Sequence, residues 1–307
     1  AISEGASLHL GHKLRSMEKM ENESFEGWIC DGKGDQFPIH AKIVIDASGV
    51  AAVCSKLVKL ENEQPLNSKG KVVAGMQYEL TSVPTDGYLD FYIWPEYAEK
   101  GYLWMIPKCD GRANVGLVTE DKPRAKKALD EFISNTHFSD SDQTLPPWKE
   151  RGSPAFGGTI PISGPFENTH YDGLMLIGDA AGFTSPLFEG GSHLALKSAV
   201  FAAKTASKSI SEGDYTSQIL SEYTRLWRAE FPPYDKILRG KSALFDLSDD
   251  EMSVMAKCFP DEMSNMGISG KAMVGIKLLL RKPGLYSKKI IPAMLAFGYS
   301  RAKYYGW

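Results

Sequence analysis

The chain has 307 residues, of which 43% are hydrophobic and 24% are charged, as in ordinary soluble globular proteins. Its length is about twice that of a typical domain, so we expect two packed units. No apolar run reaches the ~18 residues that a membrane-spanning helix needs. The four cysteines are scattered, without a metal-ligand spacing, so the sequence predicts a cytoplasmic protein with buried thiols and no metal.

Residues 1–65 are predicted to begin an α/β domain. Ser7–Leu10 alternates weakly between polar and apolar residues and is expected to be a strand. Phe25–Cys30 and Phe37–Ile45 flank the sequence Asp-Gly-Lys-Gly at 31–34. These residues predict a β-hairpin, because glycine readily adopts the positive φ angles of tight turns.

Residues 66–170 are predicted to form a second domain, a mostly antiparallel sheet. Its strand-like segments are rich in aromatic residues and separated by turn residues: Lys71–Leu80, Tyr88–Trp94, Gly101–Ile106 and Arg112–Thr119. The next segment, Lys122–Asn135, has a helical pattern.

Two similar strands flank the predicted sheet domain. Ile43–Ile45 is an unbroken β-branched run and Leu174–Ile177 is apolar throughout, as expected of strands buried on both faces. The sheet domain is therefore predicted to be inserted into the α/β domain, whose second part is 171–232. Gly191–Ile210 and Tyr215–Phe231 are its predicted helices, the latter with Tyr223, Leu226 and Trp227 at helical spacing.

Residues 233–307 are predicted to form shorter helices, broken at Pro260, Pro283 and Pro292. From Met263 to Trp307 there are eight basic residues and no acidic one, whereas the rest of the chain has 27 basic and 38 acidic residues. This distribution predicts peripheral contact with anionic membrane phosphates rather than with nucleic acid. A solvated helical face that happens to be basic is the alternative.

The segment Leu-Met-Leu-Ile-Gly-Asp-Ala-Ala-Gly-Phe at 174–183 is the strongest chemical signal. A buried strand ends at Gly178, and Asp179 can accept hydrogen bonds from sugar-like hydroxyls. Gly190 and Gly191 then open a helix whose free N–H groups can face an anion or a carbonyl. An ordinary βα turn with an N-cap Asp is the alternative for Gly-Asp-Ala-Ala alone, but the glycine pair disfavours it.

This segment resembles the second FAD fingerprint of flavoproteins with the p-hydroxybenzoate-hydroxylase-type fold. The resemblance implies that Asp179 binds the ribityl chain, and that Gly178 and Gly190 shape the same site. It also implies that the backbones of Gly191 and Ser192 lie near the isoalloxazine. The sequence Gly191-Ser192-His193 stands where the family usually has a third glycine and an apolar residue.

The segment Val-Ile-Asp-Ala-Ser-Gly at 44–49 resembles a second flavoprotein fingerprint, which implies that Asp46 and Gly49 contact the cofactor. Leu14 aligns with a position whose backbone meets the adenine. No Gly-x-Gly-x-x-Gly motif follows a strand near the start, although this fold uses one to hold the ADP half. We therefore expect a glutathione-reductase-type FAD-binding domain that lacks its first βαβ unit, and weak FAD binding without that unit.

A third segment, Tyr-Leu-Trp-Met-Ile-Pro-Lys at 102–108 followed by Ala-Asn-Val-Gly at 113–116, resembles a pattern of geranylgeranyl reductases. Ile106 replaces the family's usual Phe. Tyr102 and Trp104 are two residues apart, so they share one face of a strand. With Pro107 they are expected to wall a channel for an isoprenoid chain. From the spacing alone, a pair of core aromatic residues is the alternative.

The resemblance covers nearly the whole chain and implies an FAD-dependent reductase of isoprenoid C=C bonds. Its substrate would be a prenyl lipid or a chlorophyll side chain, and its electron donor ferredoxin or a reduced nicotinamide. Reduced flavin N5 would deliver the hydride, and His193 is the candidate for supplying the proton. The alternatives are a quinone reductase related to electron-transfer flavoprotein dehydrogenase, a flavin-dependent monooxygenase and a non-catalytic lipid carrier. The quinone reductases carry an iron–sulfur module that needs four clustered cysteines, whereas only Cys258 lies in the last third of this chain.

Overall fold

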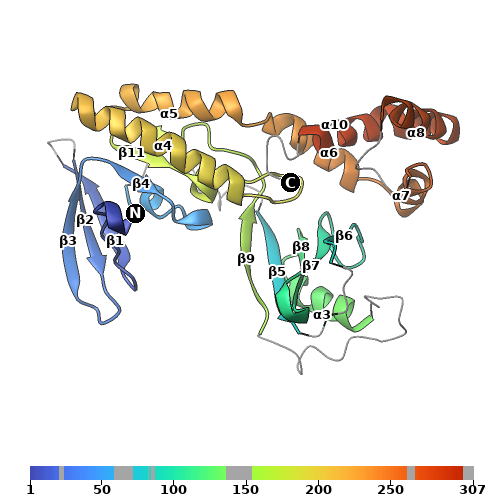
Figure 1. Ribbon diagram of the computed structural model, residues 1–307, viewed down its shortest axis with the longest axis horizontal. Coiled ribbons are helices and arrows are strands. Elements are labelled where there is room, and N and C mark those ends of the chain that lie inside the picture. The colour runs from blue at the N-terminus through green and yellow to red at the C-terminus, as the bar shows by residue number, and fades with distance from the viewer. Residues whose placement is uncertain are drawn as a thin grey trace. The chain divides into compact units, whose positions relative to one another are not determined.

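The computed structural model describes residues 1–20, 24–58, 72–81, 83, 87–135, 154–260 and 267–299. The chain forms two compact units, each built from separate stretches of sequence. The first contains residues 1–70, 163–234 and 301–307, and the second contains residues 71–162 and 235–300. Figure 1 labels most of the helices and strands of both units.

A three-stranded antiparallel sheet opens the first unit, with β2 (Phe25–Cys30) between β1 (Lys13–Lys19) and β3 (Gln36–Ala41). The predicted hairpin is confirmed. In its turn, Asp31 Oδ1 accepts three backbone N–H groups, from residues 33 to 35, at 2.8–3.0 Å. Gly34 adopts a φ of 100°, which glycine reaches without steric cost.

The predicted strand at Ser7–Leu10 is wrong. After a short 3₁₀ turn, η1 (Ile2–Glu4), these residues are exposed and irregular, and β1 begins only at Lys13. Lys13 pairs with Cys30, the last residue of β2. Because the chain turns away after Cys30, β2 offers no backbone partner to the residues before Lys13, and a strand needs such a partner.

A second sheet of the first unit has the order β10-β11-β4 and contains a parallel pair. In that pair β4 (Val44–Asp46) lies beside β11 (Leu174–Leu176), and β10 (His170–Tyr171) runs antiparallel to β11. The predicted strand 37–45 is thus divided between two sheets. The central strand β11 is buried as predicted, but β4 is an edge strand within the described chain, and Ile45 is 39% exposed.

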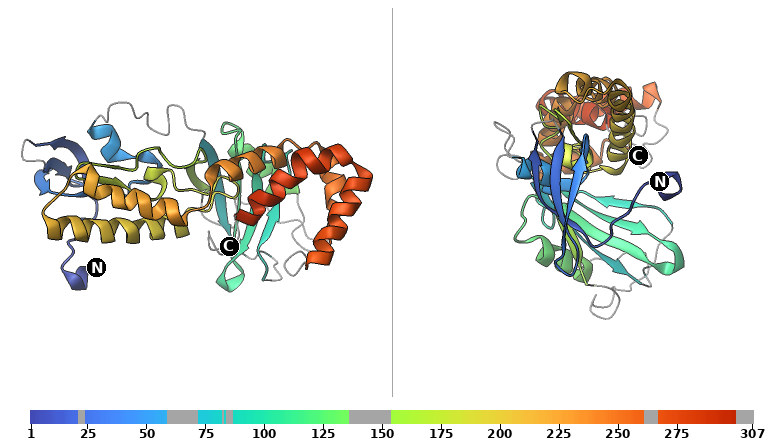
Figure 2. Two further views of the ribbon diagram at one scale, coloured as in Figure 1. Left: turned by 90° about the horizontal axis from the view of Figure 1, so that it is seen from above. Right: turned by 90° about the vertical axis from the view of Figure 1, so that its left-hand side faces the viewer.

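Two long helices, α4 (Ser192–Glu212) and α5 (Ser217–Glu230), pack side by side in the first unit (Figures 1 and 2). Apart from Leu194, the buried residues of α4 are small, which allows close helix packing: Ser198, Ala202, Thr205, Ala206 and Ser209. Helix α5 is anchored by two buried aromatic side chains. Tyr223 Oη donates to the Leu176 carbonyl at 2.6 Å, and Trp227 Nε1 donates to Thr169 Oγ1 at 2.9 Å.

The second unit contains a five-stranded antiparallel sheet with the order β6-β7-β8-β5-β9. Its strands are β5 (Val72–Leu80), β6 (Asp90–Tyr92), β7 (Tyr102–Pro107), β8 (Ala113–Thr119) and β9 (Phe156–Pro161). The four predicted strands are confirmed within the described residues, which exclude Lys71. Helix α3 (Ala125–Asn135), also predicted, packs on one face of this sheet and buries Leu129 and Phe132 among residues of the strands.

The C-terminal region is helical, as predicted. Its helices are α6 (Tyr234–Phe245), α7 (Asp249–Ala256), α8 (Ile268–Arg281), α9 (Pro283–Leu285) and α10 (Ile291–Tyr299), with the π-helical turn η6 (Tyr286–Ile290) before α10. Helix α7 ends before Pro260 and α8 ends before Pro283, as predicted. The predicted break at Pro292 is wrong, because η6 continues directly into α10 at this proline. The wide turn of η6 precedes Pro292 and can accommodate its ring and its missing N–H.

A small polar network joins β10 to α5. His170 Nδ1 lies 2.7 Å from Thr224 Oγ1, which lies 3.1 Å from Thr169 Oγ1. His170 is half-buried, and this burial lowers the pKa of its imidazole. The folded protein therefore binds a proton at His170 less readily than the unfolded chain does.

The network predicts a loss of stability in mild acid. We expect the contribution of His170 to the free energy of unfolding to be complete above the unfolded histidine pKa of about 6.5 and to decline as pH falls below it. In His170→Asn, whose amide can still bond Thr224, this part of the decline should disappear. Denaturant unfolding of both proteins at several pH values measures it, and identical pH dependences would contradict the assignment.

Candidate functional site

The two segments that resemble flavoprotein fingerprints, 44–49 and 174–183, meet in the first unit at the carboxyl ends of neighbouring parallel strands. Asp46, the last residue of β4, is paired with Leu176, the last residue of β11. The Ile177 N–H donates to the Asp46 carbonyl at 3.0 Å. As a result, η2 (Gly49–Ala51) lies against η5 (Gly178–Ala181). Ligands of open α/β sheets bind at such an edge.

Asp46 holds the loop that follows β4. Its carboxylate is 1% exposed, and Oδ1 accepts the backbone N–H of Ser48 at 2.9 Å and the Ser48 hydroxyl at 2.5 Å. Oδ2 accepts the Cys54 N–H at 2.8 Å, at the start of α1 (Val53–Leu57). Both oxygens are therefore bonded within the loop, so Asp46 fixes the backbone that carries Gly49 (φ 66°).

Ser48 and Cys54 were not identified from the sequence. Ser48 Oγ also accepts the Val53 N–H at 2.7 Å, so it links Asp46 to α1. Burial, followed by the neighbouring Asp46 carboxylate, raises the pKa of the Cys54 thiol to about 12. Cys54 is thus a protonated, structural residue at neutral pH. The spacing Asp-x-Ser, a common side-chain-to-backbone turn, was the available signal for Ser48.

Asp179 lies on η5 and is half-buried. Its Oδ1 accepts the Thr184 hydroxyl at 2.7 Å. A Cβ atom added to Gly191 would lie 3.2 Å from the same oxygen, so the carboxylate and the start of α4 are close together. Within the part of the chain that the structure describes, Asp179 Oδ2 has no hydrogen-bond partner. It is a charged acceptor available to a ligand.

Glycines allow the tight turn between β11 and α4. Gly178 has a φ of 56°, and its N–H donates to Ser198 Oγ on α4 at 3.1 Å. Gly182 has a φ of 76°, and a Cβ there would lie 2.4 Å from the Gly164 carbonyl oxygen. The Gly190 carbonyl accepts the Ser185 N–H at 3.0 Å, which closes the loop before α4.

The start of α4 is open. Gly191 is its N-cap, and no side chain caps the helix. Its first N–H groups therefore present a partial positive charge beside Asp179. Ser192 is exposed and His193, the second helical residue, is half-buried. Leu14 lies elsewhere, on β1 of the three-stranded sheet, against which α1 packs.

The predicted substrate residues lie in the second unit. Tyr102 and Trp104 share the face of β7 opposite the one that α3 covers, and their ring centroids are 5.8 Å apart. The neighbouring Phe91 ring is 5.3 Å from Tyr102. Tyr102 is buried, Trp104 is half-buried and Phe91 is exposed. Pro107 ends β7 and is half-buried.

Gln77, which the sequence did not single out, and Gly116, the last residue of the Ala-Asn-Val-Gly segment, hold Trp104 in place. The Trp104 Nε1–H donates to Gln77 Oε1 at 3.2 Å. A Cβ on Gly116 would lie 2.4 Å from the Trp104 ring, so only glycine lets the indole lie across β8. Gln77 and Trp104 both face Gly116 across the sheet, and this cross-strand pairing cannot be read from local sequence.

The sheet face away from Tyr102 and Trp104 is apolar. That face is the core of the sheet: Leu103, Met105 and Leu117 are fully or almost fully buried there together with α3. The face that carries Trp104 also carries polar residues, among them Gln77 and Glu79.

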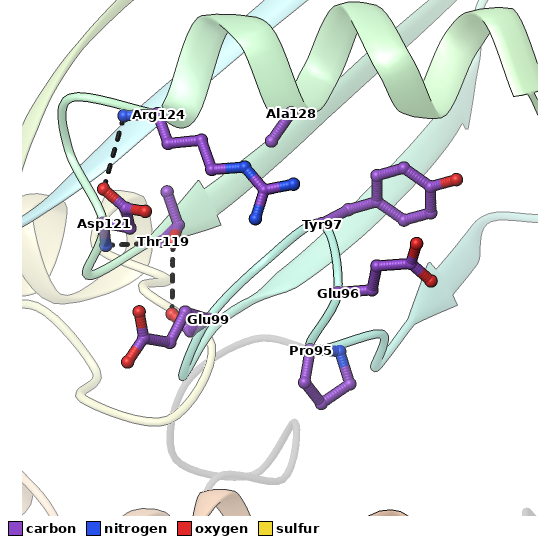
Figure 3. A pocket seen from close by; sticks show the side chains of 8 residues that line it. All are labelled: Pro95, Glu96, Tyr97, Glu99, Thr119, Asp121, Arg124 and Ala128. Atoms are coloured by element: carbon purple, nitrogen blue, oxygen red, sulfur yellow. Dashed lines mark hydrogen bonds between the residues drawn. The ribbon is translucent and has the colours of Figure 1, made fainter.

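A pocket of the second unit lies between the segment 95–99 and α3 (Figure 3). Its charged lining consists of Glu96, Glu99, Asp121 and Arg124. The Arg124 backbone N–H donates to Asp121 Oδ1 at 3.3 Å, and the Thr119 hydroxyl donates to the Glu99 carbonyl at 3.1 Å. Three carboxylates in a small pocket suit neither a prenyl chain nor a phosphate, so we assign it no substrate.

Comparison with known proteins agrees with the resemblance to geranylgeranyl reductases that the sequence shows. A family model described as the geranylgeranyl reductase catalytic domain matches residues 72–145. A solved geranylgeranyl bacteriochlorophyll reductase-like protein from Thermoplasma acidophilum has a TM-score of 0.74 at 23% identity, covering 92% of this chain and 69% of that one. A flavin-dependent halogenase has a TM-score of 0.58 at 19% identity, covering 97% and 56%. The chain therefore shares its fold with these two solved proteins.

Curated relatives identify the family of this chain. The digeranylgeranylglycerophospholipid reductase of Methanocaldococcus jannaschii is 34% identical over 262 residues, 84% of this chain and 64% of that protein. Its counterpart in Methanococcus vannielii is 30% identical over 297 residues, 95% of this chain and 72% of that protein. The chain belongs to the geranylgeranyl reductase family. It spans slightly less than two thirds of the first of these relatives.

Proposed function

We propose that the protein is an FAD-dependent reductase of C=C bonds in the prenyl chains of a membrane lipid. The observation that carries the proposal is the presence of two site elements, one in each unit, in a member of this family. One is the Asp179 carboxylate beside the open start of α4, and the other is the aromatic face around Trp104. The names of the curated relatives support a glycerophospholipid as the substrate class.

The residues of the first unit fit a flavin. Asp179 Oδ2, unbonded within the described chain, can accept ribityl hydroxyls, and the N–H groups of Gly191 and Ser192 can donate to a carbonyl or phosphate. A side chain at Gly191 would crowd Asp179. Asp46 contributes by holding the loop that carries Gly49. When bound, reduced flavin would supply the hydride, since the redox chemistry belongs to the cofactor.

The aromatic face of the second unit suits a prenyl chain. Tyr102, Trp104 and Phe91 offer apolar rings, and the bond from Trp104 to Gln77 leaves the indole ring fixed without an unpaired N–H. Positioning the alkene and excluding water are the tasks that such a wall can perform. His193 is the candidate proton donor, and the pH profile of a His193→Leu variant would test this role.

The partners follow from the same reaction. Each reduced bond needs two electrons, for which ferredoxin or a reduced nicotinamide is the proposed donor. A lipid substrate favours a cytoplasmic protein that contacts the membrane peripherally, and the basic C-terminal region supports this contact. Of its eight basic residues, Arg301 and Lys303 lie outside the described part of the chain.

The function is tested with the full-length protein, reduced without oxygen and mixed either with a geranylgeranyl glycerophospholipid or with ubiquinone. We expect the lipid to oxidise the flavin and to gain two hydrogens for each bond reduced, as measured by mass spectrometry. Ubiquinone should react slowly. Rapid oxidation by ubiquinone with an unchanged lipid would instead identify a quinone reductase.

A variant links this activity to the aromatic face. Trp104→Ala removes apolar contact area, so we expect the variant to raise the apparent Michaelis constant more for long prenyl chains than for short ones. Trp28→Ala is the matched control, because Trp28 is also a partly exposed tryptophan on a strand but lies in the first unit. An equal effect of Trp104→Ala on all chain lengths would remove Trp104 from the substrate wall.

A further inference from the structure

Helix α8 (Ile268–Arg281) is apolar on two sides. Its inner side buries Val274 and Leu278. Its outer side leaves large apolar side chains in water: Met273, Ile276, Leu279 and Leu280, with exposures of 54%, 53%, 48% and 79%. At 3.6 residues per turn, these four positions fall within an arc of about 120°. We call this set the outer stripe.

Positive charge borders the outer stripe. Lys277 and Arg281 are both exposed and lie four residues apart, so they share one side of α8, between the outer stripe and the buried side. Helix α8 contains no acidic residue. Within the described chain neither Lys277 nor Arg281 has an acidic partner, whereas Lys282 and Lys289 are paired with Glu251.

This combination fits the surface of an anionic bilayer. Burial of the outer stripe stabilises the bound state by about 25 cal/mol for each Å² removed from water. Each basic residue near an anionic surface adds an attraction that falls off within a Debye length and is therefore weakened by salt. The helix has 14 residues, and none of the described helices is long and apolar enough to cross a membrane. A short helix with this pattern lies in the interface rather than across the bilayer.

The charges disfavour a second copy of the chain as the occupant. A symmetric contact through the outer stripe would bring Lys277 and Arg281 of one copy near the same residues of the other. Like charges that are brought together and partly buried destabilise such a contact. Anionic phosphates, in contrast, complement both residues.

We propose that α8 is a membrane-docking helix, with Met273, Ile276 and Leu280 inserted among the acyl chains and Lys277 and Arg281 at the lipid phosphates. The proposal rests on the proposed function only in that a membrane lipid is the substrate. Docking would bring the protein to the layer in which that substrate is dissolved.

Co-sedimentation of the full-length protein with vesicles tests the proposal. The vesicles contain phosphatidylcholine alone or phosphatidylcholine with phosphatidylglycerol. We expect binding to the anionic vesicles, weakened by salt, and at least about tenfold weaker binding for the double variant Ile276→Ser, Leu280→Ser. The matched control is Leu196→Ser, Val200→Ser on α4, where the side chains are 70% and 65% exposed. The control should bind as the wild type does.

A second variant tests the charges. Lys277→Glu, Arg281→Glu keeps the outer stripe but should lose the preference for anionic over neutral vesicles. All substituted positions are exposed, so each variant should keep the wild-type thermal unfolding. Equal binding by wild type and the Ile276, Leu280 variant would overturn the proposal. So would a wild-type dimer that this variant converts to monomer without any vesicle binding.

The outcome is separable from that of the proposed function. Turnover of a detergent-dispersed prenyl lipid does not require vesicle binding, so it reports on the reaction alone. Vesicle binding through α8 without lipid reduction would retain this inference and contradict the proposed function. Reduction of the lipid in detergent, with no effect of the α8 variants on vesicle binding, would support the proposed function and contradict membrane docking through α8.

Discussion

The parallel pairing of β4 with β11 is the constraint on which the candidate cofactor site depends. It places Asp46 beside Leu176 and therefore brings two loops together that are far apart in the sequence. The strands are only three residues long, so the loops need further support. The buried Asp46 carboxylate supplies it for one loop, because a charge removed from water is stable only when its oxygens are bonded.

The second loop depends on backbone conformations rather than on a buried charge. Gly178 and Gly182 adopt positive φ angles, and the turn they form packs against Ser198 and Ala195 of α4. This turn directs the uncapped start of α4 toward Asp179, so a carboxylate and a set of free N–H groups lie side by side. A ligand with both hydroxyls and a carbonyl or phosphate would satisfy both kinds of group, and this is the reason for proposing a flavin at this site.

The sequence predicted the elements whose signal is local. The strands of the second unit are rich in aromatic residues and separated by turn residues, and glycines mark the turn at 178–182. Features that depend on distant partners were missed. Ser7–Leu10 alternates but faces no strand, and Ile45 is apolar but lies at a sheet edge. The covered face opposite Trp104 depends on where α3 packs. Likewise, the bonds of Asp46 to Ser48 and Cys54 show a loop-holding role that its motif alone does not reveal.

The central claim is that Asp179 and the start of α4 hold the flavin, and the affinity of the full-length protein for FAD tests it most directly. Asp179→Ala removes charge-assisted hydrogen bonds worth about 1.5–3 kcal/mol, so the dissociation constant for FAD should rise about 10- to 100-fold. Asp35→Ala, at an exposed position in the hairpin turn of the same unit, should leave it unchanged. An Asp179→Ala protein with full flavin occupancy and wild-type affinity would contradict the account.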